Sequence, residues 1–189
     1  MNVGPPVLSR DGRVVAYRAE RNGRHFIQVG DREEPAFDFV SDPALSADGA
    51  TVAYAGKRDN AWILVAGGRT WPLSRKPAAV FVSDDGRRVG WVDLEERTDG
   101  GSKARVVVEG EPGEPFGIVG NPVFSPDGGR VAYAADSGDR RYVVIGGRKF
   151  ETPYRAGDPA FSADGRRVGY GARIGRELRW KVLEVGSDR

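Results

Sequence analysis

The feature that most constrains the fold is a short pattern that recurs five times along the chain. The copies read PVLSRDGRVVAYRA, PALSADGATVAYAG, VFVSDDGRRVGWVD, PVFSPDGGRVAYAA and PAFSADGRRVGYGA. Their serines are Ser9, Ser46, Ser83, Ser125 and Ser162, so the spacings are 37, 37, 42 and 37 residues. A fixed period in this range is typical of solenoids, propellers and other repeat arrays. The repeat therefore constrains the architecture strongly and the function hardly at all.

Each copy contains the signals of a β-hairpin. In the fourth repeat, Pro-Asp-Gly at 126–128 separates two runs rich in β-forming residues, and this tripeptide favours a tight turn because glycine adopts positive φ. Two further apolar runs follow at 142–145 and 150–154, with a Gly-Gly turn between them. No long stretch shows helical periodicity. The sequence therefore predicts a four-stranded antiparallel meander of about 37 residues for each repeat.

Stacked meanders of this size predict an all-β fold, a β-propeller of five four-stranded blades. We expect one domain over residues 1–189, with blades at about 5–40, 42–74, 78–119, 121–155 and 158–186. The fourth strands are expected around Phe37–Val40, Thr70–Leu73, Phe116–Val119 and Phe150–Tyr154. The last blade is expected to be incomplete, because only residues 186–189 follow its third strand.

The ends of the array leave several arrangements open. Residues 1–3 are expected to be a stub that is too short to supply the missing strand. A closed ring with an incomplete blade, an open arc and a piece of a longer array all remain possible. The third strand of the last blade, 178–185, would keep an apolar edge unpaired. That edge predicts either self-association or a missing partner segment.

The repeat resembles a known family. The pattern P-x-F-S-x-D-G-x-x-V-A-Y, as in residues 122–133, is similar to the WD-like propeller repeat of TolB-type proteins. The resemblance covers residues 5 to about 185 and implies that the first strand of each blade lines a central channel. It also implies that the loops after the second and fourth strands share one face. The same repeat occurs in the propellers of prolyl oligopeptidase-like enzymes and in many bacterial proteins, so it does not define a function.

Composition narrows the classes of function. The chain has no cysteine and a single histidine, His25, so thiolate zinc sites and most histidine-based sites are excluded, and we expect no metal and no cofactor. The net charge is only +2, with basic and acidic residues interspersed, which argues against a nucleic-acid partner. No apolar run is long enough for a membrane span, and the start does not read as a signal peptide. We therefore expect a cytoplasmic protein, although the family has periplasmic members.

The recurring polar and aromatic residues have structural interpretations. The turn aspartates (Asp11, Asp48, Asp85, Asp127 and Asp164) are expected to cap their own hairpins rather than to form a metal site. The aromatics of the second strands (Tyr17, Tyr54, Trp91, Tyr133 and Tyr170) are expected to pack between blades. No Gly-x-Ser-x-Gly nucleophile motif is present.

Charged loops are the remaining candidates for function. The third repeat carries a longer loop, and the loops after the second strands are rich in charge. The predicted interaction face comprises Arg21, Arg24, Lys57, Arg58, Glu95, Glu96, Arg97, Asp99, Arg140, Arg141, Arg173 and Arg176. We expect a non-catalytic module that binds an unidentified protein partner through this face. The alternative is a small-ligand receptor or a hydrolase-type enzyme that acts at the mouth of the channel.

Overall fold

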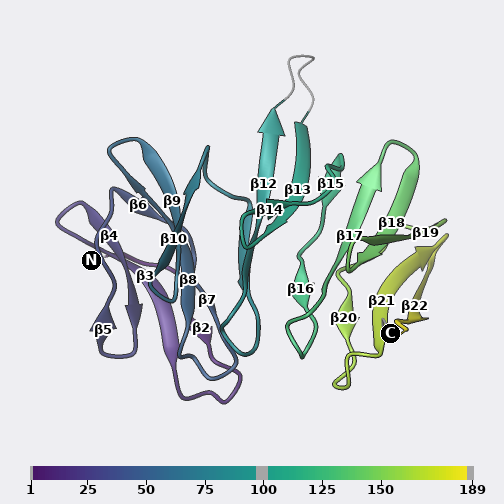
Figure 1. Cartoon of the computed structure of the whole chain (residues 1–189), viewed down its shortest axis with the longest axis horizontal. Helices are drawn as coiled ribbons and strands as arrows, with labels where there is room; N and C mark the ends of the chain where they lie inside the picture. The colour runs from purple at the N-terminus through teal and green to yellow at the C-terminus, as the bar shows by residue number, and fades with distance from the viewer. Residues whose placement is uncertain (1, 97–101, 187–189) are drawn as a thin grey trace. The chain divides into compact units, whose positions relative to one another are not determined.

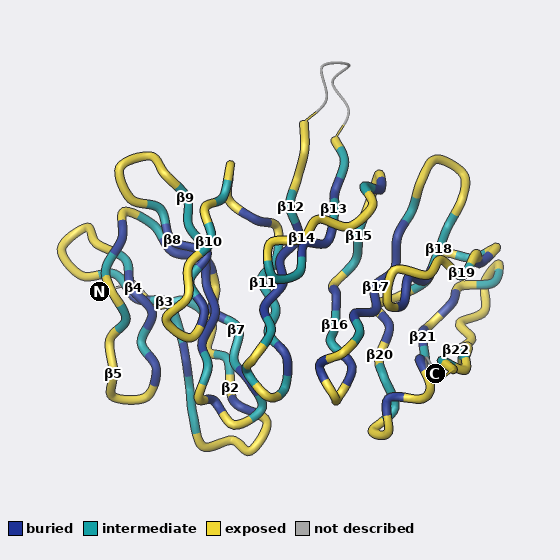
Figure 2. The backbone as a smooth tube through the Cα atoms, in the orientation of Figure 1, coloured by how far each residue is buried: buried dark blue, intermediate teal, exposed yellow. Residues whose placement is uncertain are grey.

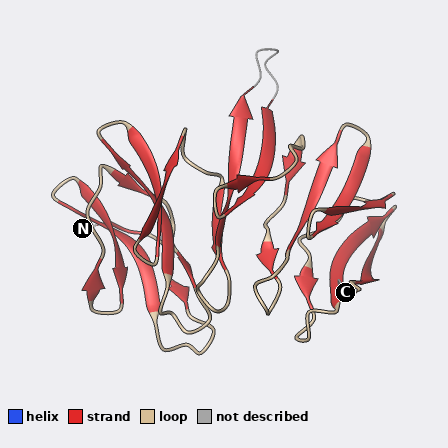
Figure 3. Cartoon of the chain, viewed as in Figure 1, coloured by secondary structure: helices blue, strands red, loops and turns tan. Residues whose placement is uncertain are grey.

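A computed structural model describes residues 2–96 and 102–186, in which all regular structure is β-strand (Figures 1 and 3). The strands form five antiparallel sheets, one for each repeat. The predictions of an all-β fold and of five repeats are therefore confirmed. No helix in the described residues is long and apolar enough to span a membrane.

The first sheet has the strand order β1-β3-β4-β5, and β2 also pairs with β3. Its strands are β1 (Asn2–Val3), β2 (Val7–Leu8), β3 (Val15–Arg21), β4 (Arg24–Val29) and β5 (Arg32–Glu33). β1 and β2 are two halves of one strand, since both lie antiparallel along the same side of β3. Two prolines interrupt this strand because they have no N–H for the ladder. The expectation that residues 1–3 form only a stub is wrong, because Asn2 and Val3 form β1.

The second and fourth sheets repeat this arrangement and add a longer outer strand. The second sheet comprises β6 (Phe39–Val40), β7 (Ala44–Leu45), β8 (Val52–Arg58), β9 (Ala61–Ala66) and β10 (Arg69–Leu73). The fourth comprises β15 (Ile118–Val119), β16 (Val123–Phe124), β17 (Val131–Ser137), β18 (Arg140–Ile145) and β19 (Arg148–Thr152). β6 and β7 both pair with β8, and β15 and β16 both pair with β17.

The third and fifth sheets have fewer strands. The third has the order β11-β12-β13-β14, with β11 (Ala79–Val82), β12 (Val89–Glu96), β13 (Ser102–Val108) and β14 (Glu111–Pro112). The fifth has the order β20-β21-β22, with β20 (Ala160–Phe161), β21 (Arg167–Ile174) and β22 (Glu177–Glu184). Within the described residues β22 pairs only with β21, so the last blade is incomplete, as predicted.

Two of the predicted fourth strands cross from one sheet to the next. Phe37 exchanges backbone hydrogen bonds with His25 in the first sheet, whereas Phe39–Val40 forms β6 of the second. Likewise, Phe116 bonds to Ala104, whereas Ile118–Val119 forms β15 of the fourth sheet. The prediction of continuous fourth strands at Phe37–Val40 and Phe116–Val119 is therefore wrong. The apolar residues on the two sides of each crossing look like one run in the sequence but pair with different sheets.

All five Ser-x-Asp-Gly segments form the predicted turn. The turn glycines have φ between 68° and 71°, a region that L side chains avoid. In every copy the serine hydroxyl donates to Oδ1 of the aspartate over 2.5–2.7 Å. The same hydroxyl accepts the N–H of the residue five positions later, and Oδ1 accepts the N–H two positions after the aspartate. Each turn thus satisfies its own polar groups.

The chain divides into two compact units, residues 1–93 with 108–110 and residues 94–107 with 111–189. The expectation of a single domain stays a prediction. In the first unit, Ala16 of the first sheet packs in one cluster with Val52 and Tyr54 of the second. In the second unit, Ala132 of the fourth sheet packs with Val168 and Tyr170 of the fifth.

These clusters follow one register. In both clusters, the second residue of one Val-Ala-Tyr motif packs against the first and third residues of the equivalent motif in the next sheet, because side chains alternate along a strand. The second strands β8 and β17 are buried along most of their length and become exposed only toward their last residues (Figure 2). Four of the five predicted packing aromatics (Tyr54, Trp91, Tyr133 and Tyr170) are buried.

Candidate interaction surface

The crossing from the first to the second sheet positions the most prominent group of side chains. Phe37 is buried, and its ring meets Tyr54 edge-on with centroids 6.0 Å apart. The next residue, Asp38, donates its N–H to the carbonyl of Lys57 in β8 over 2.8 Å. The ring and these backbone bonds fix the connection between the two sheets.

Two arginines of the predicted interaction face converge on this crossing. Arg24 and Arg58 both donate to the carbonyl of Ala36, at 3.2 and 2.8 Å. Arg24 also forms an ion pair with Asp38, whose other carboxylate oxygen accepts the N–H of Asp59 over 3.0 Å. The Arg58 guanidinium lies 4.7 Å from the Phe37 ring centroid. The structure therefore brings these arginines together, and it uses them to hold the crossing in place.

A row of aromatic and cationic side chains lies beside the crossing. Phe39 of β6 and Trp62 of β9 are both paired in register with Lys57 of β8, so the three share one face of the sheet. The Phe39 centroid is 5.7 Å from that of Trp62 and 5.8 Å from that of His25. Lys76 places its Nζ 4.9 Å from the Phe39 centroid. We call His25, Phe39, Lys57, Trp62 and Lys76 the aromatic patch.

A cavity adjoins the aromatic patch in the same unit and shares Lys76 with it. Its volume is about 230 Å³, and its lining residues are Ser41, Asp42, Pro43, Lys76, Pro77, Ala78, Ala79 and Val80. Asp42 is paired with Arg18 over 3.2 Å. A lysine between half-buried rings and a hollow suits an anionic group that is attached to an apolar one.

The other residues of the predicted face have partners and exposures of their own. Arg21 pairs with Glu33 over 2.8 Å, and Glu95 forms an ion pair with Arg105. Arg173 donates to the carbonyl of Gly175 over 3.1 Å. Glu96, Arg140 and Arg176 are exposed and Arg141 is half-buried, whereas Arg97 and Asp99 lie outside the described residues.

Two kinds of titratable group have shifted pKa values. Hydrogen bonds from the serine hydroxyl and from the backbone lower the pKa of all five turn aspartates below its ordinary value. Burial raises the pKa of Tyr133 to about 12, with Glu114 adding to the effect, and burial together with Glu34 also raises that of Tyr54. In the part of the chain that the structure describes, no three acidic, histidine or cysteine side chains are grouped so that they could hold a metal ion.

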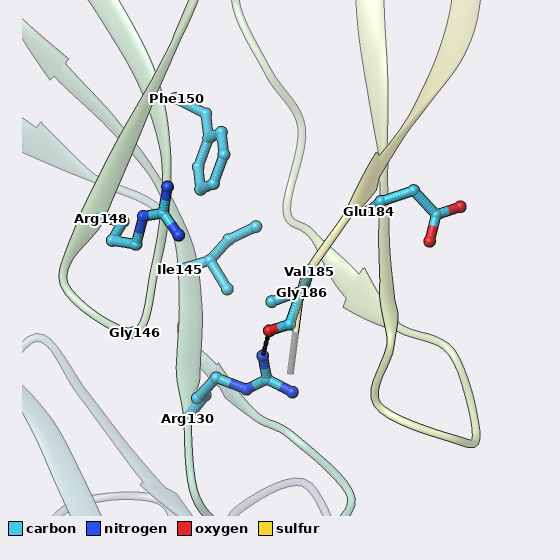
Figure 4. Close-up of a pocket in the computed structure, with 8 residues that line it drawn as sticks. All are labelled: Arg130, Ile145, Gly146, Arg148, Phe150, Glu184, Val185 and Gly186. Carbon is cyan, nitrogen blue, oxygen red and sulfur yellow. Dashed lines mark hydrogen bonds between the residues drawn. The ribbon is translucent and has the colours of Figure 1, made fainter. Parts of the chain in front are cut away.

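A second, smaller hollow of about 80 Å³ lies between the fourth and fifth sheets (Figure 4). Arg130 lies at its edge and donates to the carbonyls of Gly165 and Gly186 at 3.0 and 3.2 Å. Arg148 and Phe150 line the same side of the hollow, and Glu184 and Val185 line the other. The guanidinium of Arg130 thus ties the fourth sheet to the fifth.

Sequence reasoning missed most of the aromatic patch. The sequence pattern places Phe39 in the first blade, and it gives no sign that His25 lies beside Phe39. One signal could have corrected this: Phe37, Phe39 and Val40 match Phe116, Ile118 and Val119, so the same spacing occurs before two different repeats. Phe116 also meets Tyr133 edge-on, at 6.1 Å, as Phe37 meets Tyr54.

No family model and no curated protein matches the sequence, whereas many solved structures match the fold. TolB from Acinetobacter baumannii has a TM-score of 0.51 and 18% identity, over 97% of this chain and 52% of TolB. This chain has the fold of the TolB-like β-propellers. The acylaminoacyl peptidase of Pyrococcus horikoshii aligns over 96% of this chain and 38% of its own, with a TM-score of 0.62 and 15% identity.

The propeller domain of the Trilobed protease from Pyrococcus furiosus has a TM-score of 0.59 and 12% identity, over 97% of this chain and 67% of that domain. The chain spans about half the length of the TolB from Acinetobacter baumannii. At these identities the likeness establishes the fold alone. The expectation of a TolB-like propeller is confirmed, and the function has to be argued from the surface.

Proposed function

We propose that the chain is a non-catalytic binding module that holds a protein partner at the aromatic patch and the adjoining cavity. The observation that supports this proposal most directly is that the Phe39 ring contacts both Trp62 and Lys76. Aromatic side chains that are only partly buried supply much of the binding energy at protein interfaces. Lys57 and Lys76 add positive charge beside these rings.

The chemistry of the patch favours one kind of partner segment. An apolar side chain would pack against Phe39 and Trp62, and a neighbouring carboxylate would pair with Lys76 at the rim of the cavity. The crossing behind the patch is held by Phe37 and Asp38, so binding costs little reordering of the backbone. Arg24 and Arg58, which lie at the crossing beside the patch, would contribute at the rim of the contact. A cytoplasmic location stays a prediction.

The experiment compares capture of partners by matched variants. Wild-type protein, Trp62→Ala and Lys76→Glu are immobilised, and proteins cross-linked from a lysate of the source organism are quantified by mass spectrometry. The control is Arg87→Glu, at a side chain that is 86% exposed and lies in a hairpin turn. We expect a partner whose recovery falls at least about tenfold with Trp62→Ala and Lys76→Glu but not with the control. Equal recovery by all four proteins would rule the patch out.

The cavity is the observation that favours the second candidate, a small-ligand receptor or an enzyme. That function needs a ligand enclosed by the cavity rather than a partner lying across the rings. It predicts that Asp42→Asn and Lys76→Glu abolish ligand-induced thermal stabilisation while Trp62→Ala leaves it intact. Loss of stabilisation with Trp62→Ala would instead indicate that binding depends on the aromatic patch.

A further inference from the structure

The last sheet has a face whose counterparts in the other sheets are buried. The residue after the aromatic of each second strand (Arg18, Ala55, Ala134 and Gly171) lies on the side that faces the following sheet in the earlier repeats, and a third-strand residue lies directly opposite it. In the first, second and fourth sheets that opposite residue is Ile27, Leu64 or Val143, and none is more than 1% exposed. In the fifth sheet it is Trp180, which is 77% exposed.

The middle of this face is apolar and open, and Arg173, Arg167 and Glu184 lie on the same face toward its ends. Leu178 and Val182 flank Trp180 on the same face of β22 and are 85% and 45% exposed. Opposite Trp180 stands Gly171, where a Cβ atom would meet nothing within 4 Å. β22 is drawn almost wholly as exposed in Figure 2. We call Gly171, Leu178, Trp180 and Val182 the trailing face.

The first sheet has the complementary face. Leu8 pairs with Val15 and Val3 with Ala19, so Leu8 and Val3 lie on the side that faces the preceding sheet in later repeats. They are 59% and 58% exposed. Tyr17 stands on the same side and is only half-buried, whereas its equivalent Tyr54 is fully buried. We call Val3, Leu8, Val15 and Tyr17 the leading face.

The exposed apolar side chains concentrate on these two faces. Of the seven large hydrophobic residues that are exposed in the described part of the chain, five belong to the leading or the trailing face. Contiguous exposed apolar surface usually marks a contact site. The two faces are also the two halves of the interface that joins neighbouring sheets inside the array.

We propose that the trailing face of one copy packs against the leading face of a second copy. This contact would resemble the contact between neighbouring sheets within one chain. Tyr17 would pack on the trailing face as Tyr54 packs on the first sheet, and Gly171 leaves room for the Tyr17 ring. Such a contact is heterologous, because each copy uses a different surface. This proposal is independent of the aromatic patch, whose residues it does not use.

The test is sedimentation velocity over a wide range of protein concentration. We expect the wild-type protein to form larger species as concentration rises. Trp180→Ser and Leu8→Ser should each weaken association at least about tenfold, since each removes one half of the contact. The matched control is Ile118→Ser, at a side chain that is 51% exposed but belongs to neither face. Circular dichroism should show the same fold for all variants, because the replaced side chains are exposed.

A mixture of the two variants separates this contact from others. Trp180→Ser retains a leading face and Leu8→Ser retains a trailing face, so the equimolar mixture should form dimers and nothing larger. If Leu8→Ser alone dimerised as well as the wild type, the contact would be symmetric between trailing faces and the proposal would fail. A wild-type protein that stays monomeric at high concentration would also overturn the proposal. Trp180 would then be covered by the first sheet of the same chain or by a different protein.

Discussion

At the scale of single residues, the repeated turn is the most regular feature of the molecule. Ser46 is nearly fully buried, yet its hydroxyl donates to Asp48 and accepts the N–H of Thr51. Among the described residues, no buried side-chain nitrogen or oxygen lacks a hydrogen-bond partner. An unpaired buried hydroxyl would be costly, so the serine and the aspartate depend on each other.

The first prediction concerns the charge of this turn. Asp48→Asn should destabilise the protein at neutral pH, because the ionised carboxylate is the better acceptor for Ser46 and for the N–H of Ala50. The pKa of Asp48 is lowered in the folded state, so its stabilising effect is complete above the unfolded pKa of about 3.9. That effect is lost as the pH falls through the lower folded pKa.

Urea unfolding of the wild type and of Asp48→Asn between pH 7 and pH 2.5 would check this. The difference in unfolding free energy should shrink toward zero at the acid end. Asp31→Asn, at an exposed residue in a different turn, serves as the control. A difference that stays constant with pH would mean that the charge of Asp48 does not support the turn.

At the scale of elements, the local hairpins were predictable and the crossings between sheets were not. A strand, an Asp-Gly turn and a second strand are specified by adjacent residues, and this hairpin is present in every repeat. The crossing at Phe37 and Asp38 depends instead on partners that are distant in sequence, His25 and Lys57. Pro35 and Pro115 precede the two crossings by one or two residues, but the sequence around them does not show which sheet each apolar residue joins. The aromatic patch was missed for the same reason, because it forms only when β6 joins β8.

The second prediction concerns the outer edge of β22. Val185 donates its N–H to Arg166 on the β21 side, so alternate amides point the opposite way. The amides of Leu178, Trp180, Val182 and Glu184 should therefore exchange with deuterium much faster than those of Arg179, Lys181 and Leu183. β18 is the internal comparison, because it pairs with strands on both sides.

Residue-resolved exchange measured by NMR in dilute protein would show this alternation in β22 and its absence in β18. The measurement reports on the backbone edge of β22, whereas the association experiment reports on the side chains of its face. Protection of the four outward amides in dilute protein would mean that another strand already pairs with this edge.

At the scale of the whole molecule, the position of a residue in the array decides how much it contributes to stability. Leu64 and Trp180 occupy the same register position in the second and fifth sheets, but Leu64 is fully buried and Trp180 is not. The second sheet has neighbours on both sides, because it packs on the first sheet through Tyr54 and contacts β11 of the third. The described part of the fifth sheet packs on the fourth through Val168 and Tyr170 and leaves its other face open.

The third prediction compares these two positions. Leu64→Ala should lower the free energy of unfolding by about 2–5 kcal/mol, because it leaves a cavity in a packed core. Trp180→Ala should change it by less than about 0.5 kcal/mol when the protein is dilute enough for copies to stay apart. Chemical unfolding of both variants at low concentration provides the measurement. Equal losses would show that Trp180 is covered within the isolated chain.

The self-contained turn has a consequence for how such a chain can change over generations. A duplication or deletion of one whole repeat carries its serine, aspartate and glycine together, so the new junction leaves no hydroxyl or carboxylate without its partner. An added repeat covers one exposed apolar sheet face of the array and presents an equivalent sheet face of its own. Copy number can therefore vary by complete repeats at little cost to folding, whereas an insertion that splits a Ser-x-Asp-Gly segment would be selected against.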